Sequence, residues 1–266
     1  MDITWWLAYL ALGSFVGLMA GLLGIGGGGI MVPVLTSLFV FQGIPHEHIA
    51  HLALGTSMAA IIPSAAASLW SHHRHGAVHW NIVRFITPGI LAGTFLATFV
   101  AAFVPTRGLA LFFAFFMALM SLQMVVNIKP KPSRGLPGPV GVASVGLGIG
   151  GVSALVAIGG GSLTVPFLTW CNIKVTHAIG TSAAIGLPIA LAGALGYTLN
   201  GWGDDGLPAV ALGYVYLPAL LLMAPFSIFT APIGAKLAHL LPVTILKRVF
   251  AFMLLALAIQ MLAAVF

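Results

Sequence analysis

Long apolar stretches without a charged residue recur along this chain and constrain its fold more than any other feature. Ten basic and four acidic residues make up only 5 % of the 266 positions. A soluble domain carries about 25 % charged residues, whereas a helix that crosses a bilayer needs roughly 20 mostly apolar residues. The short alternating segments of a β-barrel are missing. We therefore expect an all-α polytopic membrane protein, multi-pass in the cell inner (plasma) membrane.

The sequence contains one series of landmarks twice. Residues 24–35 read GIGGGGIMVPVL and residues 157–168 read AIGGGSLTVPFL, and a Gly-Thr-Ser triplet follows each. The further matched pairs are Pro63 with Pro188, Pro88 with Pro218, Val104-Pro105 with Leu241-Pro242, and Gln123-Met124 with Gln260-Met261. This order predicts two membrane repeats, 1–128 and 139–266, joined by a basic cytoplasmic linker at 129–138.

Each repeat is expected to contain about five membrane segments, which gives eight to ten in total. The segments are predicted at about 4–23, 29–41, 49–71, 80–104 and 107–128, and at about 139–157, 161–171, 177–199, 208–238 and 243–265. The second segment of each repeat is too short to cross the bilayer at about 1.5 Å per residue. We predict glycine-broken half-helices at the midplane, starting near Ile30 and Leu163, or a hairpin with the neighbouring segment.

The basic residues favour an odd number of crossings in each repeat. With the linker in the cytoplasm, nine of the ten basic residues then lie inside and only Arg107 lies outside, in agreement with the positive-inside rule. An even number would divide them five and five. Two homologous halves with odd crossings must be inverted, as in many secondary transporters. The prediction is two inverted-topology repeats with both termini outside. The basic excess is thus explained without nucleic acid as a partner.

The glycine breaks predict a binding site for a small anion. Backbone outside a helix is tolerated at membrane depth where it lines a polar cavity, and the first N–H groups of a half-helix attract anions. Hydroxyls and amides nearby add donors. The expected substrate-binding residues are Gly26, Gly27, Gly28, Gly29, Thr56, Ser57, Gly159, Gly160, Gly161, Ser162, Thr181, Ser182, Gln123 and Gln260.

Other interpretations of these residues stay open. Glycines often serve only helix packing, hydroxyls often bond to their own helix, and glutamines can link helices. His177, about one turn before Thr181, is a candidate for proton coupling. The histidine clusters at 46–51 and 72–75 lie at predicted membrane edges without cysteine partners, so we expect no metal and no cofactor. Without carboxylates or lysines at span centres, we expect no enzyme.

Taken together, these motifs resemble the TauE/SafE sulfite exporter family, the transmembrane permeases of sulfur anions. The resemblance rests on the glycines running into Val-Pro at 26–33 and 159–166, on the Gly-Thr-Ser triplets, and on Ala-Pro-Ile-Gly-Ala-Lys-Leu-Ala at 231–238. It covers nearly the whole chain. It implies a secondary transporter for sulfite, thiosulfate or a small organosulfonate. A channel-like anion pathway, or a carrier of another small organic anion, is the alternative. Transport direction, coupling ion and oligomeric state stay open.

Overall fold

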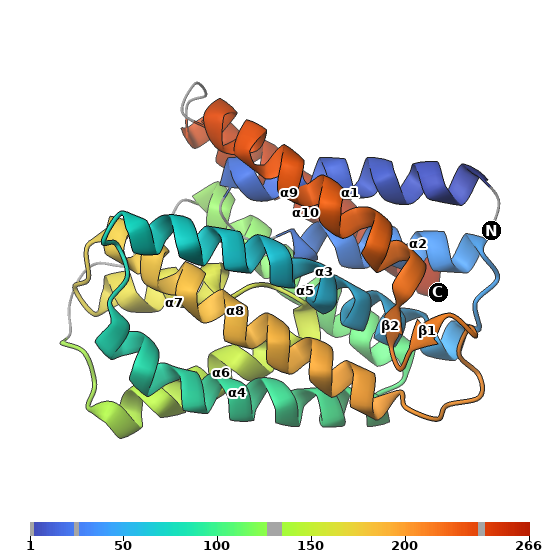
Figure 1. Cartoon of the computed structure of the whole chain (residues 1–266), viewed down its shortest axis with the longest axis horizontal. Helices are drawn as coiled ribbons and strands as arrows, with labels where there is room; N and C mark the ends of the chain where they lie inside the picture. The colour runs from blue at the N-terminus through green and yellow to red at the C-terminus, as the bar shows by residue number, and fades with distance from the viewer. Residues whose placement is uncertain (1–2, 24–26, 127–134, 239–242) are drawn as a thin grey trace.

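The computed structural model describes residues 3–23, 27–126, 135–238 and 243–266, which form a bundle of long helices (Figure 1). The described residues contain the helices α1 (Ile3–Leu23), α2 (Gly28–Phe41), α3 (His46–Arg74), α4 (Trp80–Phe103), α5 (Thr106–Val126), α6 (Pro139–Val156), α7 (Gly161–Trp170), α8 (Val175–Asn200), α9 (Leu217–Ala238) and α10 (Val243–Val265), and the strands β1 (Ala211–Leu212) and β2 (Val215–Tyr216). Seven of these helices are long and apolar enough to cross a membrane. The all-α polytopic class is confirmed.

The predicted segments correspond to the observed helices except at the start of the segment at 208–238. α9 begins at Leu217, because the chain before it forms the antiparallel β1–β2 hairpin, in which Ala211 pairs with Tyr216. Gly213 in the turn has a φ of +55°, a conformation that glycine adopts at no steric cost. The prediction of membrane helix over 208–216 is therefore wrong. Of the predicted linker, residues 129–134 lie outside the described residues.

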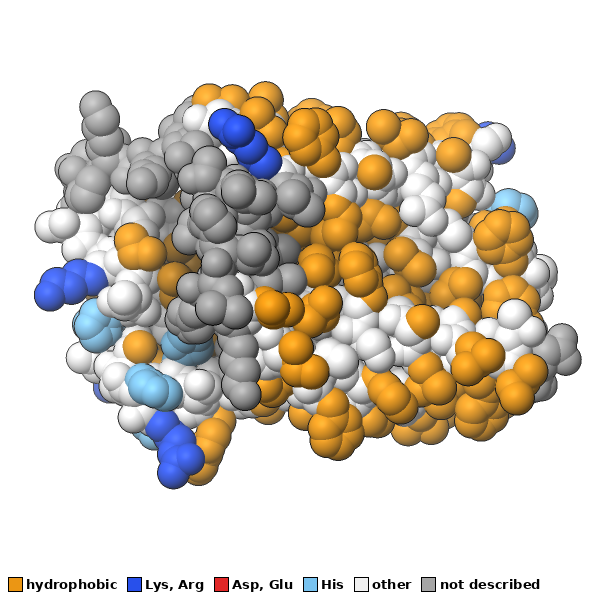
Figure 2. Space-filling view, turned by 90° about the horizontal axis from the view of Figure 1, so that it is seen from above, with side chains coloured by type: hydrophobic (Ala, Val, Ile, Leu, Met, Phe, Trp, Pro, Cys, Tyr) orange, Lys and Arg blue, Asp and Glu red, His pale blue; other side chains and the backbone are white. Residues whose placement is uncertain are grey.

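Most of the Lys and Arg side chains visible in Figure 2 lie toward the two ends of the bundle, and a largely hydrophobic surface lies between them. At one end, Arg74 closes α3 and Lys174 directly precedes α8. These two helix ends are neighbours, because Gly180 of α8 contacts Ala77 just after α3. We call this end the basic end.

The opposite end of the bundle carries the acidic side chains that the structure describes. Glu47 at the start of α3 and Asp204 after α8 each lie 3.4 Å from a ring nitrogen of His48. Arg107 lies here too, with its guanidinium 5.5 Å from the ring centroid of Phe266. We call this end the acidic end, and Figure 1 places both chain termini toward it.

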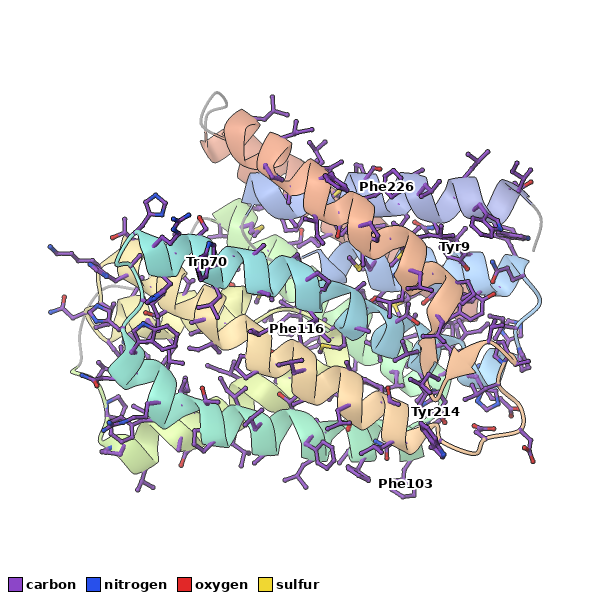
Figure 3. The ribbon with its side chains drawn as sticks, in the orientation of Figure 1. Tyr9, Trp70, Phe103, Phe116, Tyr214 and Phe226 are labelled. Carbon is purple, nitrogen blue, oxygen red and sulfur yellow. The ribbon has the colours of Figure 1, made fainter. Side chains whose placement is uncertain are left out.

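All six tryptophans lie close to one end or the other. Trp70, Trp80 and Trp170 lie at the basic end, and Trp5, Trp6 and Trp202 lie at the acidic end. Figure 3 shows Trp70 near one end, and Phe103 and Tyr214 near the other. Tryptophan concentrates at membrane–water interfaces, where its amphipathic ring reaches the headgroups. The two groups therefore mark the expected membrane boundaries.

The first helix of each half packs along the fourth helix of the other half. α1 lies on α9, and α6 lies on α4. A Cβ atom on Gly93 of α4 would overlap the carbonyl of Leu147 in α6, and one on Gly17 of α1 would overlap the backbone of Ser227 in α9. Small residues allow this close approach of backbones, on which helix association in lipid depends. Helices from the first and the second half of the chain thus pack against each other in pairs.

The helix boundaries also correct one of the matched pairs from the sequence. Pro88 is the ninth residue of α4, whereas Pro218 is the second residue of α9. The ninth residue of α9 is Pro225, which therefore corresponds to Pro88. The error arose because the β1–β2 hairpin shifts the start of α9 relative to the landmark residues.

We predict that Gly93→Leu lowers the stability of the protein by about 1–3 kcal/mol, because overpacking forces the backbones of α4 and α6 apart. Gly148→Leu in α6 is the matched control, since Gly148 is exposed and a Cβ there meets no described atom within 4 Å. Thermal unfolding of both detergent-purified variants measures the difference. Equal melting temperatures for the two variants would contradict the packing role of Gly93.

Candidate functional site at the glycine breaks

The second glycine break is a short non-helical segment between α6 and α7. α6 ends at Val156, and Ala157 closes it in a left-handed conformation with a φ of +50°. α7 then begins at Gly161, and the N–H of Thr164 donates to the carbonyl of Gly160 at 2.8 Å. The first N–H groups of a helix have no partner within that helix. The N–H of Gly161 already donates to the carbonyl of Gly159, so the donors that the break presents are the next N–H groups of α7.

The first break leads into α2 in the same manner. α2 begins at Gly28, and the carbonyl of Gly27 accepts from the N–H groups of Ile30 and Met31 at 3.1 and 3.0 Å. Gly26 lies outside the described residues. Both half-helices thus begin two residues earlier than the predicted starts at Ile30 and Leu163, so the last glycines belong to their first turns.

The two breaks lie against each other. The carbonyl oxygen of Ala157 lies so close to Gly28 that a Cβ atom there would overlap it. The side chain of Ile61 in α3 contacts both breaks, because its methyl groups lie 2.8 Å from a Cβ built on Gly28 and 3.7 Å from one built on Gly159. Gly160 faces Ile189 of α8. The structure therefore brings the glycines of both halves together, between α3 and α8.

Each half-helix also carries a proline at its sixth position. Pro33 and Pro166 lie inside α2 and α7, in the second turn of each helix. Proline has no N–H, so the carbonyls four residues earlier, those of Gly29 and Ser162, lack their helical donor. The meeting point thus contains acceptors as well as donors of the main chain.

The threonine of each Gly-Thr-Ser triplet accepts a hydrogen bond from a backbone N–H group of the other half of the chain. Thr56 Oγ1 of α3 accepts from the N–H of Tyr216 at 2.9 Å, at the start of α9. Its neighbour Gly55 leaves room for the carbonyl of Tyr214, which a Cβ would overlap. We call this contact the acidic-end clasp.

The second triplet makes the same contact at the other end of the molecule. Thr181 Oγ1 of α8 accepts from the N–H of His79 at 3.0 Å, at the start of α4. A Cβ on Gly180 would lie 2.5 Å from the carbonyl of Ala77. We call this contact the basic-end clasp. Both triplets therefore join helix starts across the two halves, and their threonine oxygens already accept backbone hydrogen bonds.

The remaining predicted site residues divide between the centre and the ends of the bundle. Ser57 is fully buried, and its hydroxyl has no partner among the described residues. Ser182 is 4 % exposed. Gln260 donates to Ser37 Oγ at 3.0 Å, nine residues along α2 from Gly28. Gln123 occupies the same place in α5, the eighteenth position, as Gln260 in α10. Gln260 therefore lies along α2 rather than at the start of that helix.

His177 lies at the basic end, next to the clasp. Its ring centroid is 4.6 Å from that of His79, and its Nδ1 atom is buried without a partner among the described residues. The ring therefore packs between the starts of α8 and α4, and its part in proton coupling stays a prediction. No group of three or more possible metal-ligating residues occurs in the described part of the chain.

Thr164 is a polar residue of the centre that the sequence reasoning missed. It is fully buried, its hydroxyl has no partner among the described residues, and it lies 3.5 Å from a Cβ built on Gly160. The matched position in the first half is Met31. A position-by-position comparison of residues 24–35 with 157–168 would have revealed this added hydroxyl.

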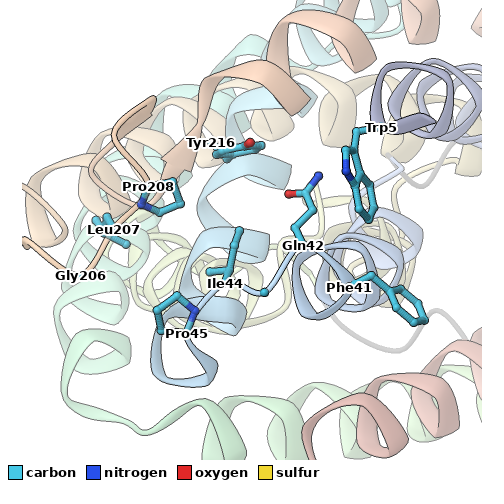
Figure 4. Close-up of a pocket in the computed structure, with 10 residues that line it drawn as sticks. Trp5, Phe41, Gln42, Ile44, Pro45, Gly206, Leu207, Pro208 and Tyr216 are labelled. Atoms are coloured by element: carbon cyan, nitrogen blue, oxygen red, sulfur yellow. The ribbon is translucent and has the colours of Figure 1, made fainter. Parts of the chain in front are cut away.

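A separate cleft of about 620 Å³ opens at the acidic end (Figure 4). Trp5 of α1, Gln42 after α2 and Tyr216 of β2 line it, together with Pro208. The Nε2 of Gln42 donates to the hydroxyl of Tyr9 at 2.8 Å. Because Tyr216 belongs both to this cleft and to the acidic-end clasp, the cleft ends where the two halves are joined.

We predict that Thr56→Val lowers the free energy of unfolding by about 1–3 kcal/mol, because the buried N–H of Tyr216 loses its acceptor. Thr56→Ser keeps the oxygen and serves as the control. Thermal unfolding and amide hydrogen exchange across residues 211–217 measure the effect. Exchange as slow in Thr56→Val as in the control would show that the acidic-end clasp does not hold this segment.

Comparison with known proteins agrees with this architecture. The chain matches the family model described as sulfite exporter TauE/SafE over residues 9–261. A probable membrane transporter protein from Haemophilus influenzae is 36 % identical over 260 residues, which cover 97 % of this chain and 98 % of the relative. The probable membrane transporter protein YdhB from Bacillus subtilis is 26 % identical over 241 residues, 87 % of this chain and 90 % of the relative. No solved structure matches significantly. The chain therefore belongs to the TauE/SafE sulfite exporter family and is a membrane transporter of that type.

Proposed function

We propose that the protein is a secondary transporter that carries a small sulfur-containing anion across the cell inner membrane. The observation that carries the proposal is the meeting of the two glycine breaks, where the carbonyl of Ala157 packs on Gly28. Two half-helices begin at this point, so their first N–H groups and the positive ends of their dipoles supply an anion site.

The proposed architecture is an inverted repeat of residues 1–128 and 139–266. In Figure 1, α3 begins toward the end that holds the chain termini, whereas its counterpart α8 begins toward the opposite end. The pairing of helices between the halves and the two matched clasps support the same relation. In such proteins the substrate lies near the midplane, between the repeats.

The two clasps suit the gates of an alternating-access cycle. They lie at opposite ends of the molecule, and each joins α3 or α8 to the start of a helix from the other half. Both are closed in this structure. Opening the acidic-end clasp would expose the centre to one side, and opening the basic-end clasp would expose it to the other.

Binding by backbone N–H groups, without a charged side chain, suits a substrate anion that the transporter must release again. Most of the Lys and Arg side chains visible in Figure 2 lie toward the ends of the bundle, so the proposed site relies on backbone N–H groups. The family's description as a sulfite exporter supports a sulfur oxyanion as substrate, and we propose sulfite, thiosulfate or a short organosulfonate. Proton coupling through His177 is part of the proposal.

We predict that sulfite, thiosulfate or an organosulfonate raises the melting temperature of the purified protein, since a ligand stabilises the state that it binds. Gly160→Leu is expected to abolish this shift, because its side chain would fill the space toward Ile185 and Ile189. Gly148→Leu is the control and is expected to keep it. An undiminished shift in Gly160→Leu would exclude the breaks as the site.

The topology and the carrier mechanism have separate tests. With both termini outside, a C-terminal reporter that works only in the cytoplasm is expected to stay inactive, while one inserted in the 129–138 linker is expected to work. In proteoliposomes, unlabelled anion on the opposite side should accelerate exit of the labelled anion. Flux without such acceleration would identify a channel-like pathway instead.

A further inference from the structure

His48 in the first turn of α3 has a carboxylate at each of its ring nitrogens. Its Nε2 atom lies 3.4 Å from Oε1 of Glu47, and its Nδ1 atom lies 3.4 Å from Oδ2 of Asp204, in the loop after α8. A neutral imidazole has one N–H donor, whereas a protonated ring has two. Only the protonated ring can therefore donate to both carboxylates at once.

The ring of His48 is built into the contact between α3 and this loop. Its side chain is only 12 % exposed, so its ion pairs are screened less than those of a free surface. A Cβ atom on Gly206 would lie 2.5 Å from His48 Nε2. Gly206 does not adopt the left-handed conformation that favours glycine, so room for the ring explains the glycine at this position.

The loop that His48 contacts is connected to the acidic-end clasp. Asp204 Oδ1 accepts from the N–H of Gly206 at 3.1 Å, and the Tyr214 hydroxyl donates to Asp204 Oδ2 at 3.4 Å. Tyr214 lies two residues before Tyr216, whose N–H donates to Thr56 in the clasp. The segment 204–216 is thus attached to α3 by His48 near its start and by the clasp at its end.

The same loop forms part of the wall of the cleft in Figure 4. Two segments line the cleft close to His48: Ile44 and Pro45 before α3, and Gly206, Leu207 and Pro208 of the loop. His48 therefore joins two chain segments that form this wall, next to the clasp.

Other titratable and charged groups lie near His48 without bridging the loop to α3. The ring of His51 lies 5.0 Å from that of Tyr214, and its nitrogens face main-chain carbonyls of α3 and α4. Burial and the carboxylate of Asp204 raise the pKa of the Tyr214 hydroxyl, so this hydroxyl stays neutral over the range in which histidine titrates. The guanidinium of Arg107 packs on an aromatic ring.

We propose that His48 is a proton-sensitive latch on the acidic-end clasp. When its ring is protonated, it binds Glu47 and Asp204 and holds the loop against α3, so the clasp stays closed. Loss of the proton leaves one carboxylate without its donor and releases the loop, which allows the clasp to open. Acid on this side of the membrane therefore slows the transport cycle. The link to transport rests on the proposed function, in which the clasp is a gate.

Amide hydrogen exchange of the full-length purified protein at about pH 5.5 and about pH 8 tests the latch, after correction for the intrinsic exchange rate at each pH. Opening of residues 204–216 should be about two- to fivefold more frequent at pH 8, the scale of an ion pair near the surface. His48→Gln should remove this difference. His46→Gln changes an exposed histidine two residues earlier, and this matched control should keep the difference.

Two further variants act on the loop side of the contact. Gly206→Ala displaces the ring without removing a titratable group. Asp204→Asn keeps an oxygen that can accept from Gly206 while it removes the charge. Both should abolish the pH difference. A wild type without the difference, or a His48→Gln variant that keeps it, overturns the latch. Should His48→Gln fail to fold, an unchanged pH difference in the two loop variants overturns it.

Counterflow of labelled thiosulfate in proteoliposomes, with equal pH on both sides, tests the link to transport. Thiosulfate keeps its charge over this range, so only the protein changes. The ratio of the rates at pH 8 and pH 5.5 should be about two- to fivefold larger in the wild type than in His48→Gln. Equal ratios beside a pH-dependent loop overturn the role of the latch in the gate. A wild type that carries no thiosulfate contradicts the substrate of the proposed function, whereas hydrogen exchange still decides the latch.

Discussion

The contact between the carbonyl of Ala157 and Gly28 holds the centre of the molecule together. It is possible only because position 28 has no side chain, and it joins the first residue of α2 to the non-helical segment that follows α6. Main-chain polar groups are costly in a membrane unless protein surrounds them. Each break therefore supplies part of the surroundings that the other needs. α3 and α8 lie beside them, with Ile61 of α3 next to Gly28 and Ile189 of α8 next to Gly160.

Around this centre, the most extensive helix contacts join one half to the other. α1 with α9, α4 with α6 and both clasps follow the same rule. The glycines in these contacts differ in purpose. Gly93 lets two helices touch, whereas Gly55 admits the carbonyl of Tyr214. Residue type alone does not distinguish these purposes; the neighbouring atoms do.

The spans and breaks could be predicted because the bilayer acts on each segment separately. Apolar length determines the helices, and a run of glycines interrupts them whatever surrounds it. The clasps could not be predicted in this way, since Thr56 and Tyr216 are 160 positions apart and Thr181 and His79 are 102 apart. A local pattern holds no information about such partners. Gln260 was matched correctly with Gln123, yet its contact with Ser37 depends on how α10 packs against α2.

The pairing of helices between the halves has a consequence for how the chain is made. α1 ends at Leu23, whereas its packing partner α9 begins only at Leu217. At about 5–20 residues per second of synthesis, α1 enters the membrane roughly 10 to 40 s before that partner exists. Its glycine face must meanwhile rest against lipid or against a chaperone of the insertion machinery. The first half therefore cannot mature alone, and assembly of the whole bundle waits for the last helices to be translated.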